Sequence, residues 1–443
     1  MTLQNKKVLI VGMAKSGIGS AKMCQRLGAV VVLYDGKERS HFEDLIKDLE
    51  SLPFDYIFGE MEEAKLNDFD LMVLSPGVPT DLEFIKKART LGIEVIGEIE
   101  LAYAYCKAPI VAITGTNGKT TTTSLLGEIM TAFNPLTYVV GNIGNPFTDV
   151  VLEAPAQSIF VAEMSSFQLE SIKTFHPKVS AILNLTEDHL NRHKTFENYI
   201  GAKLRITENQ NQSDFCILNY DDALCRGLAT QISAQIVWFS MTEKVDGVYY
   251  EDGKILIAWN GIHETFIAMK DVFLFGKHNI ENIMAALAMS LCMEVPLEVV
   301  RESVANFKGV AHRIEFVKEV SGVCFYNDSK ATNPDSAIAA IVAMRTPTVL
   351  IGGGMDKGST FDEWILAFGN KIKALILFGE TKFLIEETAK KYNFKPVLLV
   401  NTLEEAVVQA TKIAENGDSV LLSPACASWD MFVSYEHRGQ LFK

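Results

Sequence analysis

Short apolar runs that end in glycine, serine or a polar residue recur along the whole chain, and helix-favouring segments separate them. Uninterrupted β-branched and aliphatic runs of this length are typical of strands that are buried on both faces, as in a parallel sheet covered by helices. The pattern therefore predicts an α/β protein with mainly parallel sheets. The expected strands lie at residues 8–11, 30–34, 71–74, 110–113, 158–161, 179–183, 215–218, 348–354, 374–379 and 419–423.

The order of these runs divides the chain into three predicted domains, residues 1–97, 98–309 and 310–443. A chain of 443 residues has room for two to four domains, each with its own core. The stretch 237–269 differs from the rest because it alternates in polarity. Hairpin-type dipeptides predict antiparallel strands there. They are Asp246-Gly247, Asp252-Gly253 and Asn260-Gly261.

Composition narrows the functional classes. The formal net charge of −14 and the lack of a basic stretch argue against a nucleic-acid partner. No charge-poor apolar run approaches the ~20 residues that a membrane-spanning helix needs. The first residues lead directly into a strand and lack a signal-peptide cleavage pattern, so we expect a cytoplasmic protein without a membrane partner. The seven cysteines form no C-x-x-C pair and are expected to be reduced, mostly buried thiols.

The first block has the order of a nucleotide-binding βαβ unit. The strand at 8–11 runs into Gly12 and a glycine-containing turn at 16–19, and the strand at 30–34 ends in Asp35. Ala14 stands where the dinucleotide pattern has its second glycine, which disfavours a dinucleotide. A mononucleotide, a nucleotide-sugar and a purely structural unit remain open. A further strand, 71–74, runs into the turn Ser75-Pro76-Gly77.

The segment that follows the strand at 110–113 resembles a phosphate-binding loop. Its sequence is Gly115-Thr116-Asn117-Gly118-Lys119-Thr120-Thr121, and a helix-favouring stretch comes next. Backbone N–H groups and the helix N-terminus attract phosphate, Lys119 adds a positive charge, and the Thr120 hydroxyl suits Mg²⁺. Ile113 stands where the usual pattern begins with glycine, so the loop is a shortened variant. An ordinary glycine turn before a helix is the alternative interpretation.

Two later strands also end in ionisable residues. Glu163 follows the strand at 158–161, where a carboxylate can bind Mg²⁺ or simply begin a helix. The strand at 179–183 leads into a crowded polar turn in which His189 can bind a metal or a substrate oxygen, whereas His193 is expected at the surface. By composition alone, Lys203 is an ordinary surface lysine of a helix.

Further polar clusters follow in the last third of the chain. Asn279 and Asn282 lie three residues apart on a predicted helix, so both amides can reach one ligand, although helix capping also explains Asn279. Other clusters lie at 311–315, 326–334 and 352–358. Each of these is equally compatible with a solvated loop.

Four stretches together resemble the Mur ligase family of ATP-dependent enzymes that form peptide bonds. The resemblance extends over the whole chain in the family's order and spacing. The first stretch marks the superfamily, and the other three are similar to its D-glutamate-adding branch. The stretches are 115–120, Glu163-Met164-Ser165-Ser166-Phe167-Gln168-Leu169, Asn327-Asp328-Ser329-Lys330-Ala331-Thr332-Asn333 and Ser423-Pro424-Ala425-Cys426-Ala427-Ser428-Trp429-Asp430.

The resemblance implies three domains: a Rossmann-like uridine-nucleotide domain, a central P-loop ATPase domain and a Rossmann-like C-terminal domain. It also implies a monomer that adds D-glutamate to UDP-N-acetylmuramoyl-L-alanine in peptidoglycan precursor synthesis, with ATP and two Mg²⁺ ions. Carboxylate activation by ATP gives an acyl phosphate, and domain closure is expected because the ligand contacts are spread over all three blocks.

Residue roles follow from the same resemblance. The implied ATP contacts are Gly115, Thr116, Asn117, Gly118, Lys119, Thr120, Thr121, Asn279, Asn282, Arg313 and Asp328. The implied metal ligands are Thr120, Glu163, His189 and a carbamylated Lys203, and the catalytic set is Lys119, Glu163, His189 and Lys203. The implied substrate contacts are Lys15, Ser16, Asp35, Lys37, Ser75, Gly77, Asn142, Ser165, His189, Lys330, Thr332, Lys357 and Ser428.

The chain departs from the family pattern at two positions. Gly36 replaces a hydroxyl residue of some relatives, and the spacing around Lys357 differs from that of others. The alternatives are another amide ligase of the superfamily, such as a folylpolyglutamate synthase, and a regulatory nucleotide-binding protein without turnover. The N-terminal block and the stretch 163–168 disfavour the first alternative, and the acceptor-side motifs disfavour the second.

Overall fold

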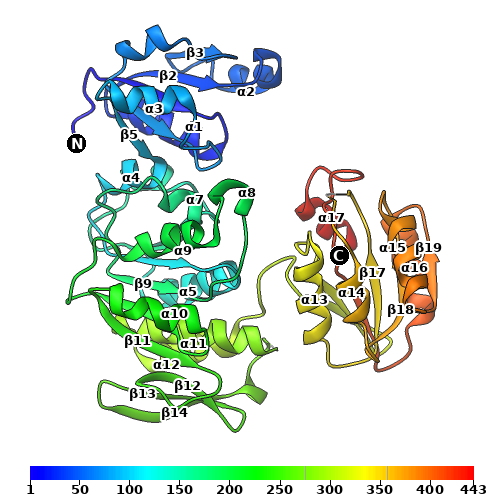
Figure 1. Ribbon diagram of the computed structural model, residues 1–443. Helices are drawn as coiled ribbons and strands as arrows, with labels where there is room; N and C mark the ends of the chain where they lie inside the picture. The colour runs from blue at the N-terminus through cyan, green and yellow to red at the C-terminus, as the bar shows by residue number, and fades with distance from the viewer. Residues whose placement is uncertain (275, 357) are drawn as a thin grey trace. The chain divides into compact units, whose positions relative to one another are not determined.

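The computed structural model describes residues 1–274, 276–356 and 358–443, so the predicted site residue Lys357 lies outside the described residues. The chain folds into two compact units (Figure 1). Unit 1 comprises residues 1–271 and 281–305, and unit 2 comprises residues 272–280 and 306–443. Three sheets, in which most neighbouring strands are parallel, confirm the predicted α/β class. The boundaries near 97 and 309 stay predictions.

The first sheet lies in unit 1 and has the order β3-β2-β1-β4-β5, with every neighbouring pair parallel. Separate apolar clusters cover its two faces, as the continuously apolar strands predict. Its strands are β1 (Lys7–Val11), β2 (Val30–Asp35), β3 (Phe54–Phe58), β4 (Leu71–Leu74) and β5 (Glu94–Gly97). Its helices are α1 (Lys15–Arg26), η1 (Arg39–Phe42), α2 (Glu43–Asp48), η2 (Glu63–Asp68) and α3 (Glu83–Thr90).

The strand order reverses direction between β1 and β4. In open α/β sheets, ligands bind at such a switch point, outside the carboxyl ends of the strands. Here that edge carries Gly12 after β1 and Ser75 after β4. The Ser75 hydroxyl donates a hydrogen bond of 3.0 Å to the Gly12 carbonyl oxygen, and Gly12 has φ +94°, which favours glycine.

The second sheet, also in unit 1, has the order β14-β13-β12-β11-β10-β9-β6-β8-β7. Its strands are β6 (Ile110–Thr114), β7 (Thr137–Gly141), β8 (Ile159–Glu163), β9 (Val179–Ile182), β10 (Phe215–Asn219), β11 (Gln235–Ser240), β12 (Gly247–Glu251), β13 (Lys254–Trp259) and β14 (Ile262–Ala268). Its helices are α5 (Lys119–Phe133), α6 (Phe147–Val150), α7 (Ser166–Leu169), α8 (Leu190–His193), α9 (Phe196–Leu204), η3 (Arg205–Thr207), α10 (Ala223–Leu228), η4 (Ala229–Gln231), η5 (Met269–Asp271), α11 (Lys277–Cys292) and α12 (Leu297–Asn306).

The predicted hairpins at Asp252-Gly253 and Asn260-Gly261 are confirmed, because β12, β13 and β14 pair antiparallel. The prediction at Asp246-Gly247 is wrong. There β11 and β12 pair in parallel, and a Cβ on Gly247 would lie 1.9 Å from the Trp238 carbonyl oxygen. Gly247 thus permits a close approach of two backbones instead of a hairpin turn.

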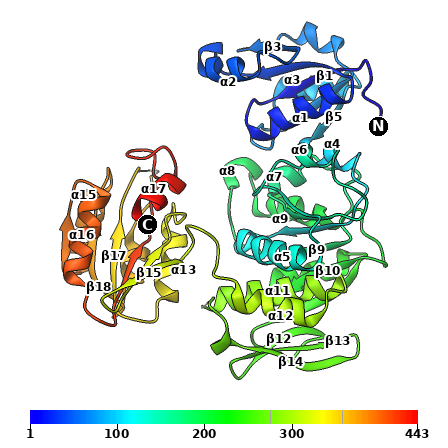
Figure 2. The same ribbon diagram turned by 180° about the vertical axis from the view of Figure 1, so that it is seen from behind.

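Helix α4 (Glu98–Tyr103) follows β5 and, with α1 and α6, packs where the first and second sheets adjoin (Figure 2). The Glu98 side chain is buried there, and its Oε1 atom accepts hydrogen bonds from the N–H and the hydroxyl of Thr148 at 2.8 and 3.0 Å. A Cβ on Gly19 of α1 would lie 2.7 Å from the Thr148 hydroxyl. Gly19 therefore permits this close packing of α1 on α6.

Unit 2 contains the third sheet, with the order β15-β16-β20-β17-β18-β19. Apolar clusters lie on both of its faces, which makes it a second doubly wound sheet. The strands are β15 (Glu315–Val320), β16 (Val323–Asn327), β17 (Thr348–Gly352), β18 (Ile372–Leu377), β19 (Val397–Leu399) and β20 (Ser419–Leu422). The helices are α13 (Pro334–Ala343), α14 (Asp362–Leu366), α15 (Lys382–Lys391), α16 (Leu403–Ile413) and α17 (Tyr435–Phe442).

All seven cysteines are free thiols, and five of them are buried, as the scattered spacing predicts. Among the described residues, no helix combines the length and apolarity that a bilayer span requires.

Candidate active site

The loop between β6 and α5 has the backbone geometry that its glycines allow. Gly115 has φ +144° and Gly118 has φ +84°, and Gly118 is the residue from which α5 begins. A Cβ on Gly118 would lie 2.3 Å from the Oδ1 atom of Asn282. The helix start has no side-chain cap, so the N–H groups of its first turn are available to an anion.

Two residues that the sequence analysis did not single out hold this loop in place. The Asn184 Oδ1 atom accepts the Asn117 N–H at 2.8 Å, and the Asn184 Nδ2 atom donates to the Asn117 carbonyl at 3.1 Å. The Tyr199 hydroxyl lies 3.1 Å from the Thr116 hydroxyl, which also receives the Thr186 N–H at 3.0 Å. Asn184 lies at the end of a strand beside β6, and this position could have identified it in the sequence as a residue that contacts the loop.

Two lysine side chains converge on the carbonyl oxygen of Gly115. Lys119 Nζ donates to the carbonyl oxygens of Gly115 and Thr116, each at 2.8 Å. Lys203 Nζ donates to the Gly115 carbonyl at 2.7 Å and lies 4.6 Å from the centre of the Tyr199 ring. Lys203 is only 2% exposed, so the interpretation as a surface lysine is wrong. Burial, followed by the charge of Lys119, lowers the pKa of Lys203 well below its usual value.

Glu163 ends β8, the strand next to β6, and is 1% exposed. Its Oε1 atom accepts a hydrogen bond of 2.7 Å from the Asn142 side chain, and its backbone carbonyl accepts the Asn142 N–H at 2.9 Å. The Oε2 atom is buried and has no hydrogen-bond partner among the described residues. A buried carboxylate oxygen without a partner has strong reason to bind a cation, so Glu163 fits a Mg²⁺ ligand.

His189 begins α8 with a left-handed backbone, φ 52°. Its side chain is half exposed and lies 3.5 Å from the Asp188 carboxylate and against the Phe167 ring. The prediction that His193 is a surface residue is wrong. His193 is 6% exposed, and its Nε2 atom lies 2.9 Å from the Ser166 hydroxyl, because α8 packs this side chain against α7. Among the described residues, no group of three His, Cys, Asp or Glu side chains could hold a metal ion.

The two asparagines of α11 have different surroundings. Asn282 belongs to unit 1, and its Oδ1 atom accepts a hydrogen bond of 3.2 Å from the Thr122 hydroxyl, beside Gly118. Asn279 belongs to unit 2 and lines a pocket of about 410 Å³. The pocket is mostly apolar, and its lining residues are Phe273, Leu274, Asn279, Lys308, Arg313, Ile314, Phe316 and Tyr326.

The polar groups after β16 and β20 form a second cluster, in unit 2. The Asp328 carboxylate accepts hydrogen bonds from the Ser423 hydroxyl at 2.7 Å and from the Ile314 N–H at 3.2 Å. Burial raises the pKa of Asp328 to about 7. Lys330 Nζ lies over the Tyr435 ring, Ser428 is buried, and Thr332 is partly exposed.

Arg438, which the sequence analysis did not single out, ties these two loops together. It is fully buried on α17, and its guanidinium donates to the Ser329 hydroxyl and carbonyl at 3.0 and 2.8 Å. It also donates to the Cys426 and Ala427 carbonyls at 3.1 and 3.2 Å. Arg438 is distant in sequence from both motifs, so no local sequence pattern pointed to this role.

At the switch point of the first sheet, Asp35 joins two backbone segments. Its carboxylate accepts the Met13 N–H at 3.2 Å and the Lys37 N–H at 3.1 Å. Lys15 and Ser16 occupy the first turn of α1, and Ser75 and Gly77 follow β4. Five of the six predicted nucleotide-side residues are thus spread over the carboxyl ends of β1, β2 and β4, and the sixth, Lys37, is held there through Asp35.

The Ser165 side chain caps a helix, and this role competes with its predicted contact to the substrate. Its hydroxyl accepts the Gln168 N–H at 3.2 Å, and the Gln168 side chain accepts the Ser165 N–H at 2.9 Å, which is a capping box at the start of α7.

Comparison with known proteins agrees with this geometry. Three family models match successive parts of the chain: a Mur ligase MurD-like N-terminal domain at residues 6–97, a Mur ligase middle domain at 113–290 and a Mur ligase glutamate ligase domain at 312–426. A protein from Thermoanaerobacter pseudethanolicus named UDP-N-acetylmuramoylalanine--D-glutamate ligase is 50% identical over 100% of this chain and 98% of its own length.

The chain belongs to the Mur ligase family. Proteins with the same printed name from Alkaliphilus oremlandii and Clostridioides difficile are 51% and 49% identical over 100% of this chain and 98% of their own lengths. Among solved Mur ligase structures, UDP-N-acetylmuramate-alanine ligase MurC from Thermotoga maritima aligns with a TM-score of 0.62 at 18% identity. The alignment covers 99% of this chain and 98% of the MurC chain. At this identity the likeness concerns the fold alone.

Proposed function

We propose that this Mur ligase joins D-glutamate to UDP-N-acetylmuramoyl-L-alanine in peptidoglycan precursor synthesis and converts ATP to ADP and phosphate. The observation that carries the proposal is the full-length identity of about 50% with relatives named for this reaction. The loop between β6 and α5 supports it, because Gly115 and Gly118 have positive φ angles and α5 begins there with Lys119, as in a phosphate-binding turn.

The chemical difficulty is that a carboxylate is a poor electrophile. In the proposed reaction the γ-phosphoryl group of ATP moves to the carboxylate of the L-alanine residue and ADP leaves. The D-glutamate amine then attacks the acyl phosphate, and the tetrahedral intermediate releases phosphate and forms the amide. The chain contributes positioning and positive charge, with Lys119 next to the transferred phosphoryl group.

Thr120, Glu163, His189 and a carbamylated Lys203 are the proposed ligands for two Mg²⁺ ions. When bound, Mg²⁺ neutralises the charge that converges on the phosphoryl group. The unpartnered Oε2 atom of Glu163 supports the first site. Carbamylation needs a neutral amine, and the burial of Lys203 favours that form.

The adenosine end of ATP is assigned to residues of unit 2. The apolar pocket around Asn279 and Arg313 has a size and lining suited to a purine base. Asn282 is proposed to contact the phosphate end, since it lies beside Gly118. Asp328 is proposed as a contact of the nucleoside.

The remaining proposed contacts belong to the two other substrates. Asn142 and Ser165 are proposed to lie near the reacting L-alanine carboxylate. Lys330, Thr332, Lys357 and Ser428 are proposed to hold D-glutamate. Lys15, Ser16, Asp35, Lys37, Ser75 and Gly77 are proposed to hold the uridine diphosphate end of the nucleotide-sugar.

Phosphate release measured with each substrate omitted in turn tests the proposal. We expect release only when UDP-N-acetylmuramoyl-L-alanine, D-glutamate and ATP are all present, and loss of release in Lys119→Ala. Release with another amino acid in place of D-glutamate would assign a different ligase. Release without the uridine substrate would contradict the proposed function.

A further inference from the structure

Arg192 joins the turn that carries His189 to the loop that follows β4. Its guanidinium NH2 atom donates a hydrogen bond of 2.9 Å to the Val78 carbonyl oxygen, and its NH1 atom lies 3.5 Å from the Gly77 carbonyl oxygen. Arg192 and this loop are 114 residues apart in sequence, and both belong to unit 1. The contact therefore connects the first sheet with the second.

The Arg192 side chain is held on the other side by α7 and its end. The NH2 atom also donates to the Glu170 carboxylate at 2.7 Å, and the guanidinium lies 4.9 Å from the centre of the Phe167 ring. The Arg192 and Glu170 side chains are only 13% and 16% exposed. A charge-assisted hydrogen bond with so little solvent is stronger and more rigid than a surface ion pair.

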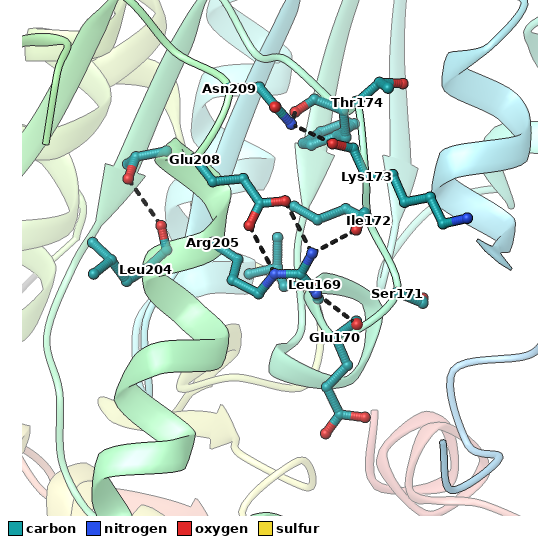
Figure 3. A network of polar contacts seen from close by, with 12 residues as sticks. Leu169, Glu170, Ser171, Ile172, Lys173, Thr174, Leu204, Arg205, Glu208 and Asn209 are labelled. Atoms are coloured by element: carbon teal, nitrogen blue, oxygen red, sulfur yellow. Dashed lines mark hydrogen bonds and ion pairs between the residues drawn. The ribbon is translucent and has the colours of Figure 1, made fainter. Parts of the chain in front are cut away.

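The backbone of Glu170 is itself held in place by Arg205 (Figure 3). The Arg205 guanidinium donates to the carbonyl oxygens of Leu169 and Glu170 at 2.9 and 2.6 Å and to that of Ile172 at 2.5 Å. Figure 3 shows the Glu170 side chain pointing away from Arg205. Its carboxylate is shared by Arg192, at 2.7 Å from Oε2, and His193, whose Nδ1 atom lies 3.4 Å from Oε1. Arg205 directly follows α9, the helix that carries Lys203.

We infer that Arg192 is a positioning residue that sets the spacing between the nucleotide end of the substrate and the reacting centre. The loop after β4 lies at the switch point where the uridine diphosphate end is proposed to bind. Arg192 lies on α8, which His189 immediately precedes, and its partner Glu170 follows the segment that contains Glu163 and Ser165. The inference rests on the proposed function, because only a substrate held at both ends needs this spacing.

The physical consequence is that a change at Arg192 affects the reaction rate and leaves the binding of UDP almost unchanged. The affinity of a ligand that contacts only the first sheet does not depend on the hydrogen bonds between Arg192 and the loop after β4. The reaction rate of a substrate anchored at one end and reacting at the other does depend on them, since a misplacement of about 1 Å at the reacting atoms can lower the rate by roughly 10²-fold.

Arg192→Met tests this, because methionine keeps an apolar stem over Phe167 but loses the hydrogen bonds. We expect the Kd of UDP, measured by calorimetry, to stay within about twofold of wild type and kcat to fall by roughly 10- to 100-fold. The KM for ATP should be unchanged. The kcat of Arg192→Lys should lie between those of wild type and Arg192→Met, since lysine has no planar fork with which to reach both partners.

Arg301→Met is the matched control. Arg301 lies over the Phe266 ring and donates to the Phe266 carbonyl and the Glu264 carboxylate, but it does so at the β14 edge. We expect its kcat and UDP affinity to equal those of wild type. Glu170→Gln keeps the shape of the partner and should reduce kcat in the same direction as Arg192→Met, which covers the case in which Arg192→Met fails to fold.

Wild-type kcat in Arg192→Met and Glu170→Gln would overturn the inference, as would a loss of UDP affinity equal to the loss of kcat. Failure of the proposed function itself is distinguishable, because wild-type enzyme would then release no phosphate with the three substrates. In that case amide hydrogen exchange at Gly77 and Val78 still tests the contact between Arg192 and this loop. Exchange should be faster in Arg192→Met than in Arg301→Met. Equal exchange rates would show that Arg192 does not hold this loop.

Discussion

The side-chain amine of Lys203 donates a 2.7 Å hydrogen bond to the backbone carbonyl of Gly115, the first residue of the phosphate loop. This contact brings α9 against the turn between β6 and α5, although the two residues are 88 positions apart. The lysine is buried next to Lys119, so its charged form is disfavoured. A neutral amine at this position is the starting material for a carbamate.

Lys203→Met should therefore lower the rate of ligation on the order of 10²-fold, because the proposed carbamate oxygen close to the phosphate loop cannot form. Wild-type enzyme incubated with ¹³C-labelled bicarbonate should show a carbamate carbon signal by NMR, and Lys203→Arg should not. Full wild-type activity in buffer freed of carbon dioxide would contradict carbamylation.

Glu163→Gln should weaken the dependence on Mg²⁺ without unfolding the protein. The amide can still accept the Asn142 hydrogen bond, but it offers no charge to a cation, so we expect kcat to fall on the order of 10²-fold. The thermal midpoint should stay equal or rise, because an uncompensated buried charge is removed. Glu98→Gln is the control, since the Glu98 Oε2 atom is likewise buried with no hydrogen-bond partner in the described part of the chain. An unchanged Mg²⁺ titration in Glu163→Gln would refute the assignment.

Asp328 makes the stability of unit 2 depend on pH. Its pKa is raised to about 7, so the folded state keeps a proton that the unfolded state releases above about pH 4. Stability therefore falls as the pH rises from about 4 to 7. Asp328→Asn should remove this fall and be more stable than wild type at pH 8 by on the order of 4 kcal/mol, with little difference at pH 4. Urea unfolding at both pH values measures it, and parallel curves for the two proteins would disprove it.

Arg438→Met should destabilise unit 2 by roughly 3 kcal/mol or more, because the carbonyls of Ser329, Cys426 and Ala427 lose their buried donor. Arg438→Lys should recover only part of this loss, since lysine lacks the planar fork. We also expect a higher KM for D-glutamate, because both loops of the proposed acceptor site are released. Arg26→Met is the control, because Arg26 is exposed and has one ion pair. Chemical denaturation and initial rates would show whether the two arginines really differ.

Much of the fold follows from local pattern. The apolar runs at 8–11, 110–113 and 419–423 are strands because only a sheet covered on both faces buries such segments completely. The turn glycines were predictable for the same reason, since Gly115 and Gly118 have backbone angles that other residues rarely adopt. Gly247 shows the limit, because the sequence pattern of a hairpin turn is also that of two backbones in close contact.

The amino-acid sequence by itself determined the fold class, the phosphate loop and the family, because short-range spacing and long runs of identity carry that information. Only the tertiary structure decided that Lys203 and His193 are buried, that Arg438 and Asn184 hold the loops, and that Arg192 joins two sheets. The reason is physical: the burial and charge of a side chain depend on neighbours that arrive from distant parts of the chain. Local composition cannot report those neighbours.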